Sequence, residues 1–230
     1  KNVSVSGSWS PDYIKDPQCI VLGSSSSSIG SKSTILAVSN PIKLINVPYI
    51  SQQGIPTGCE SVSSVMVLQY YKIDIQPYDF ISRYLPKMPV ESRPDPNCVF
   101  VGNPYSSHAY GCFSPCITTA LKNVLKDKNN FIVNNTTGRS LQTLCSQFID
   151  HSIPVIVWAT MSMIPTKIGG SSWRIKYVNN DAKYKVGDLF KWPGNEHCLV
   201  LVGYNNENYI VNDPLAGIGC YPKSLFEQRF

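Results

Sequence analysis

The apolar positions between Cys59 and Tyr71 fall on nearly all sides of a helix, with only small serines between them. A helix that is apolar all round is buried, so this pattern predicts a helix at the centre of the fold. Two further helices are predicted near 115–126 and 141–151, the first of which begins with a proline.

The pattern becomes strand-rich after these helices. Short apolar runs predict strands at 155–159, 172–178, 198–203 and 209–211. Only Asn205, Asn206 and Glu207 separate the last two runs, which predicts a hairpin. Helices followed by antiparallel strands indicate an α+β fold.

Residues 1–43 differ in composition from the rest of the chain. The segment from Gly23 to Thr34 holds seven serines and two glycines in twelve positions, which is typical of a flexible linker. The flanking segments 3–5 and 35–38 can form edge strands. We therefore expect an N-terminal extension over 1–43 and one compact domain over 44–230.

The net charge of the 230 residues is +5, and part of it is concentrated in one window. Six basic residues lie between Lys167 and Lys191, beside two acids. They form either a solvated hairpin face or a contact with an anionic cell wall, membrane surface or acidic substrate. No nucleic-acid motif and no membrane-length apolar run is found, so we expect neither nucleic-acid binding nor stable membrane insertion.

Cys59 is the candidate nucleophile. Thr57 and Glu60 fit a capping box, which would make Thr57 the N-cap and place Cys59 in the first helical turn. The positive end of a helix stabilises a thiolate. The sequence thus predicts a Cys59 pKa below that of a free cysteine.

His197 and Asp213 complete a candidate catalytic set. His197 lies at the mouth of a buried strand, 138 residues after Cys59, and Asp213 follows 16 residues later at the far end of the neighbouring strand. An acid there can accept the second imidazole N–H and fix the tautomer, whereas Asn212 would point to the opposite face. This order and spacing are typical of papain-like thiol enzymes.

A glutamine shortly before Cys59 can donate to a developing oxyanion. Gln53 has the six-residue spacing of papain-like enzymes, and Gln52 closes the preceding Val47–Gln52 phrase. Both glutamines are candidates at this stage.

Seven short segments match the motifs of one peptidase family: 47–52, 56–63, 102–104, 110–111, 154–157, 196–198 and 213–214. Through them the chain resembles, over roughly residues 44–228, the stand-alone, C39-like branch of the bacteriocin-processing double-glycine cysteine peptidases. The resemblance implies a papain-like fold with a Cys59–His197–Asp213 site. The sequence shows no ATP-binding P-loop or transmembrane run, so the leader-peptide substrate of the transporter-fused members does not automatically carry over.

The leading functional hypothesis is a cysteine peptidase that acts on a peptide or protein substrate and needs no cofactor. A thiol amidase of cell-wall peptides and a catalytically silent papain-like binding module are the alternatives. The spacing of His108, Cys112 and Cys116 is compatible with a zinc site, but Pro115 interrupts it and a fourth ligand is missing, so no metal is expected.

Eight cysteines and the serine-rich linker suggest an exported protein. The chain begins at Lys1, and we expect that a signal peptide has been removed and that the protein lies outside a bacterial cell or on its surface. At least one structural disulfide is expected. Cys98, Cys112 and Cys116 fall in the loop-rich middle, and Cys198 and Cys220 flank the predicted hairpin.

Overall fold

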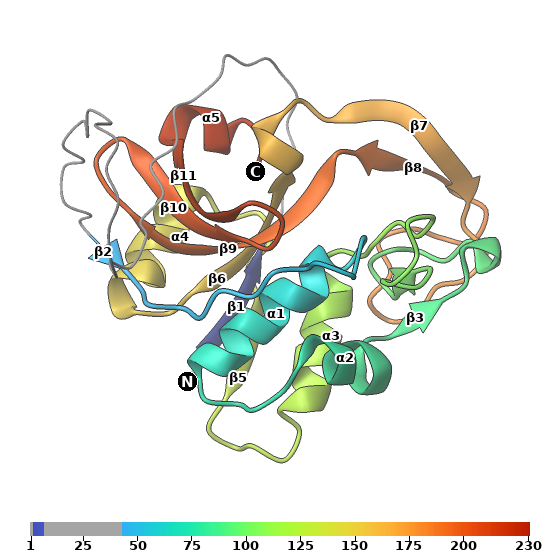
Figure 1. Cartoon of the computed structure of the whole chain (residues 1–230). Coiled ribbons are helices and arrows are strands. Elements are labelled where there is room, and N and C mark those ends of the chain that lie inside the picture. The colour runs from blue at the N-terminus through green and yellow to red at the C-terminus, as the bar shows by residue number, and fades with distance from the viewer. Residues whose placement is uncertain (1, 7–42) are drawn as a thin grey trace.

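A curved sheet forms the centre of the computed structural model, which describes residues 2–6 and 43–230 (Figure 1). Its order is β11-β10-β9-β6-β1-β5, and β2 pairs with the end of β9. The short pairs β3–β4 and β7–β8 lie outside it. The strands are β1 (Asn2–Ser6), β2 (Lys43–Leu44), β3 (Lys87–Met88), β4 (Phe100–Val101), β5 (Ile132–Asn135), β6 (Val155–Thr160), β7 (Lys167–Arg174), β8 (Leu189–Gly194), β9 (Glu196–Tyr204), β10 (Asn208–Asp213) and β11 (Gly217–Pro222).

The helices occupy the expected positions and add two short ones. The structure has α1 (Cys59–Tyr70), α2 (Pro77–Asp79), α3 (Ser114–Val124), α4 (Leu141–Gln147) and α5 (Lys223–Glu227). A π-helical turn, Phe80–Tyr84, follows α2, and α4 is shorter than predicted because the chain tightens into a 3₁₀ turn at Ile149–His151. No helix in the described part of the chain combines the length and apolar character needed to cross a membrane.

The predicted α+β architecture is confirmed, with one strand in an unexpected place. Strands β6, β9, β10 and β11 are antiparallel neighbours, and the β9–β10 hairpin forms as predicted. Strand β1 instead runs parallel to β5 and β6 and lies between them. Residues 3–5 are therefore interior to the sheet, and the expectation of an edge strand there is wrong. The serine-rich segment and residues 35–38 lie outside the described residues.

Helix α1 is buried as its apolar pattern predicts, since every residue from Cys59 to Leu68 is inaccessible to solvent or nearly so. Its serines let the helix approach β9 closely. Ser63 Oγ donates a hydrogen bond to the carbonyl oxygen of Cys198 (3.3 Å), and Ser64 Oγ donates to that of Glu60 (2.6 Å). The Ser63 bond holds the N-terminal half of α1 against the start of β9, whereas the Ser64 bond lies within the helix.

The strand predicted at 172–178 instead covers Lys167–Arg174, as β7, because its pairing with β8 begins at Lys167. Strand β7 pairs with β8, which forms the hairpin considered for the basic 167–191 window, although β8 itself was not among the predicted strands; this hairpin extends from the main sheet in Figure 1. After Arg174 the chain turns away, and the backbone N–H of Lys176 donates to the carbonyl of Arg93. The six basic side chains of the 167–191 window are all exposed on this hairpin and its connection.

Candidate active site

His197 and Asp213 meet in the interior, at the same end of the β9–β10 hairpin. The Nε2 atom of His197 lies 2.7 Å from Oδ1 of Asp213, and the two residues are 1% and 2% exposed. The backbone N–H groups of Leu215 (2.8 Å) and Ala216 (3.3 Å) donate to the same oxygen. Asn212 faces elsewhere, as predicted, and donates to the carbonyl of Val47 (3.0 Å).

The electrostatics of this pair favour an ionised acid. Burial alone would raise the pKa of Asp213, but the hydrogen bond and charge of His197, together with the two backbone donors, lower it below the usual value of 3.8. Because Nε2 is bonded to Asp213, Nδ1 is the imidazole atom left for proton transfer.

Cys59 occupies the first position of α1, but the predicted capping box is absent. Gly58 is the N-cap, without a side-chain cap bond. Thr57 instead donates to the carbonyls of Pro104 (3.2 Å) and Ser106 (3.1 Å). Position 58 needs glycine because a Cβ there would lie 2.4 Å from the Ile55 side chain.

The surroundings of the Cys59 thiol favour its protonated form over the thiolate. It is 7% exposed, and its Sγ donates to Oε2 of Glu60 (3.3 Å). Burial raises the pKa of Cys59 well above its usual value, and the negative charges of Glu60 and Glu196 raise it further. A backbone hydrogen bond from Cys198 lowers it, but by less. The prediction of a low-pKa thiol is therefore wrong for this arrangement.

Two buried carboxylates, Glu60 and Glu196, flank the thiol, and neither was predicted as a site residue. Glu60 Oε1 accepts the backbone N–H of Cys112 (2.7 Å), and burial raises the pKa of Glu60 to about 7. Burial, followed by the charge of Glu60, raises the pKa of Glu196 well above 4.5. Gly111 allows this approach, since φ is +147° and a Cβ would lie 2.5 Å from Glu60 Oε1. The available signal was their adjacency to Cys59 and His197.

The two candidate oxyanion glutamines differ in burial. Gln52 is 4% exposed, whereas Gln53 is exposed. The backbone N–H of Gln52 donates to the carbonyl of Pro214 (2.9 Å), which anchors Gln52 beside the catalytic acid candidate Asp213. Its Nε2 makes only a long bond to the Ile55 carbonyl (3.4 Å).

The sequence profile of the Peptidase_C39 like family matches residues 44–230. The chain belongs to this family. A putative C39-like peptidase from Bacillus anthracis, solved by crystallography, is 27% identical and has a TM-score of 0.66, with 81% of this chain and 91% of that chain covered. The uncharacterised protein YvpB of Bacillus subtilis is 23% identical over 192 residues, which span 82% of this chain and 70% of YvpB.

The remaining predicted features lie outside the candidate site around Cys59, His197 and Asp213. His108 is exposed in its loop, while Cys112 and Cys116 are buried, and the three form no metal-binding group within the described residues. His151 lies in the 3₁₀ turn after α4. The expected crosslinking of the loop-rich middle is wrong, because six cysteines are free thiols in the structure: Cys59, Cys98, Cys112, Cys116, Cys145 and Cys198.

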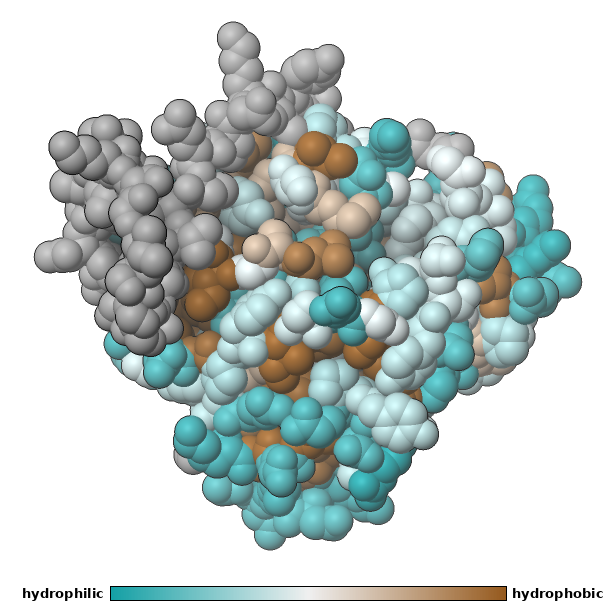
Figure 2. Space-filling model, in the orientation of Figure 1, coloured by the Kyte–Doolittle hydropathy of each residue, from teal (hydrophilic) through white to brown (hydrophobic). Residues whose placement is uncertain are grey.

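Exposed apolar side chains border the candidate site. The Tyr49 hydroxyl donates to the carbonyl of Pro214 (3.5 Å), and the backbone N–H of Leu215 donates to Asp213. The backbone N–H of Met161 donates to the carbonyl of Asn195 (2.9 Å). All three are at least 37% exposed. Figure 2 shows apolar residues interspersed with pale and hydrophilic ones across the face seen in Figure 1.

A separate cavity of about 550 Å³ lies between the β7–β8 hairpin and the start of α3. Phe113 and Trp192, whose rings stack 5.5 Å apart, and Phe190 line it. Its other wall includes Trp158, whose Nε1 donates to the carbonyl of Cys112 (3.0 Å). Cys112 links the cavity to the candidate site, because its carbonyl accepts from Trp158 in the cavity wall and its N–H donates to Glu60. The side chains of Cys59, His197 and Asp213 do not line the cavity.

The raised pKa of Glu60 predicts that stability falls between about pH 4.5 and 7. Below 4.5 Glu60 is protonated in both the folded and unfolded states; as the pH rises to 7, the unfolded chain releases its proton first, so the free energy of unfolding decreases. A shift of this size corresponds to about 3 kcal/mol. Urea unfolding at pH 5 and 7.5 measures it.

Glu60→Gln should remove the part of this pH dependence that Glu60 contributes, because the amide does not titrate, whereas Glu196, whose pKa is also raised by burial, keeps its own part. Glu91→Gln, an exposed glutamate in a 3₁₀ turn, is the matched control and should keep it. Equal pH dependence in the two variants would show that Glu60 has an ordinary pKa.

Proposed function

We propose that the protein hydrolyses peptide bonds with Cys59 as nucleophile and His197 as general base and acid. Asp213 orients the imidazole, and the Gln52 side chain and the backbone N–H of Cys59 stabilise the oxyanion. The first N–H groups of a helix have no intrahelical acceptor, so that of Cys59 is available for this role.

The buried His197–Asp213 pair is the observation that carries the proposal. Among the residues the structure describes, it is the one place where basic and acidic side-chain atoms lie within 4.0 Å of each other. Burying a histidine beside an acid is costly unless their geometry is good. His197 is also close enough to Glu60, in the first turn of α1, for its charge to lower the Glu60 pKa, which supports a catalytic pairing with the adjacent Cys59. The Cys59 thiol lies against the next residue of β9, Cys198, whose backbone hydrogen bond reaches it.

The reaction begins with transfer of the Cys59 proton to Nδ1 of His197. The thiolate attacks the peptide carbonyl carbon, and the oxyanion collapses as the imidazolium gives its proton to the leaving amine. A water molecule, deprotonated by His197, then hydrolyses the thioester and releases the acid. Because the thiol donates to Glu60 at rest, the first step requires rotation of the Cys59 side chain towards His197.

A catalytically silent binding module is the second candidate, and the Cys59–Glu60 hydrogen bond favours it. A thiol held protonated by burial and two carboxylates is a poor nucleophile. In that case the apolar rim of Tyr49, Met161 and Leu215 would hold a peptide without cleaving it.

Digestion of a peptide library, analysed by mass spectrometry, tests the proposal. The wild-type protein should produce cleaved peptides and Cys59→Ala should produce none. Cys145→Ala, a buried cysteine in α4, is the matched control and should cleave like wild type. Cleavage confined to added cell-wall peptides would indicate the thiol amidase, and no cleavage with retained peptide binding would indicate the binding module.

A further inference from the structure

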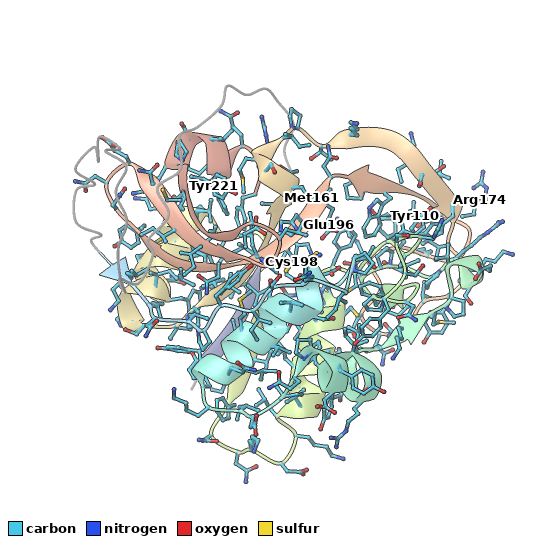
Figure 3. The ribbon with its side chains drawn as sticks, in the orientation of Figure 1. Tyr110, Met161, Arg174, Glu196, Cys198 and Tyr221 are labelled. Atoms are coloured by element: carbon cyan, nitrogen blue, oxygen red, sulfur yellow. The ribbon has the colours of Figure 1, made fainter. Side chains whose placement is uncertain are left out.

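Three side chains of metal-binding type converge where α1 meets β9. Cys59 Sγ, one carboxylate oxygen of Glu60 and one of Glu196 all lie within 4.8 Å of one another, and all three residues are buried. Figure 3 labels Glu196 at the start of β9, above the N-terminal end of α1. The proposed peptidase reaction uses the thiol but gives no role to the Glu196 carboxylate.

Glu196 differs from Glu60 because one of its carboxylate oxygens has no hydrogen-bond partner. Both Glu60 oxygens take part in hydrogen bonds, from the Cys112 backbone and the Cys59 thiol. Glu196 is only 9% exposed, yet its Oε1 is buried without a hydrogen-bond donor. A buried acceptor without a donor is rare in proteins, and a carboxylate oxygen in that situation is suited to a cation.

We propose that Cys59, Glu60 and Glu196 bind a Zn²⁺ ion, which blocks Cys59. Cysteine sulfur and glutamate oxygen are both established zinc ligands, and three protein ligands leave the fourth tetrahedral position open. The sulfur ligand disfavours Mg²⁺ and Ca²⁺, which take oxygen ligands. The ion replaces the thiol proton and any proton held by the two carboxyl groups, and these protons pass to solvent, after which the thiolate sulfur and one oxygen of each carboxylate bind the metal.

His197 stands outside this ligand group. Its Nε2 is bonded to Asp213, and its other nitrogen is not within the 4.8 Å cluster. The zinc site is therefore distinct in composition from the proposed catalytic set and shares only Cys59 with it. Blocking of catalysis rests on the proposed nucleophilic role of Cys59, whereas binding of the ion does not.

Titration of the chelator-stripped protein with Co²⁺, without substrate, tests the site by absorbance. We expect a thiolate-to-cobalt charge-transfer band that one equivalent of Zn²⁺ abolishes. Glu196→Gln should weaken cobalt binding by at least about tenfold, since loss even of an outer-shell partner costs about 10–100-fold. Glu91→Gln is the matched control and should bind like wild type, and Cys59→Ser should lose the band.

Alkylation of Cys59 gives a second readout. Zn²⁺ should protect Cys59 from iodoacetamide in the wild-type protein but not in Glu196→Gln, with the modified peptide identified by mass spectrometry and folding checked by circular dichroism. A band that persists in Cys59→Ser, no band in wild type, or equal affinities of Glu196→Gln and Glu91→Gln would overturn the site. Neither readout needs turnover. Loss of peptidase activity would therefore not by itself produce any of the outcomes that overturn the zinc site.

Discussion

His197→Ala is expected to reduce kcat/KM by roughly 10⁴-fold or more, to the background of the Cys59→Ala variant. The effect should be large because burial and two carboxylates keep the Cys59 thiol protonated, so the thiol depends on a base to lose its proton. The measurement is steady-state cleavage of the peptide that the library digest shows to be cut fastest.

The matched control for this variant is His151→Ala, an exposed histidine outside the site, which should retain wild-type activity. His197→Ala also leaves Asp213 buried without its partner, so far-ultraviolet circular dichroism must show that the variant is folded. Folded His197→Ala protein with near-normal turnover would exclude His197 as the base.

Asp213 variants separate orientation from charge. Asp213→Asn can keep an acceptor oxygen where His197, Leu215 and Ala216 all donate, and should lose only about tenfold, since a hydrogen bond to a charged group is worth roughly 1 kcal/mol more than a neutral one. Asp213→Ala should lose much more. A larger activity loss for Asn212→Ala than for Asp213→Ala would show that Asn212 is the orienting residue.

The central helix and the hairpin could be predicted because their signals are local. An apolar helix of this length has no stable place except the interior, and a three-residue connection forces β9 and β10 to pair, which brings His197 to Asp213. Strand β1 could not be placed this way. Its partners are β5 and β6, more than 120 residues away, and parallel pairing leaves no sign in the short Asn2–Ser6 segment.

The surroundings of the thiol depend on distant backbone atoms, which the sequence does not reveal. Thr57 and Glu60 match a capping box, yet the Thr57 hydroxyl donates to carbonyls in the 104–106 loop and Glu60 accepts from Cys112, 52 residues away. Hydrogen bonds to residues distant in sequence therefore replace the capping box that the local sequence predicts. Glu60 therefore faces the thiol, and burial first and the charge of Glu60 second raise, rather than lower, the pKa of Cys59.

Gln52→Ala is expected to lower kcat by about 10²–10³-fold, the usual cost of removing one oxyanion donor. The side chain is buried beside the Asp213–Pro214 turn, and its Nε2 is held by only one long hydrogen bond, so it can turn to a developing oxyanion with little loss. KM should change little, because the interaction forms mainly in the transition state. Steady-state kinetics on the same peptide measures both constants.

Gln53→Ala is the matched control, because it removes the same side chain at the neighbouring, exposed position. It should leave kcat and KM near wild type. Gln52→Glu adds a sharper comparison: it keeps the size of the side chain but places a carboxylate where the oxyanion develops, so kcat should fall at least as far as in the alanine variant. Near-normal kcat in Gln52→Ala together with a large loss in Gln53→Ala would reverse the assignment, and near-normal kcat in both would mean that the oxyanion is stabilised by backbone N–H groups alone.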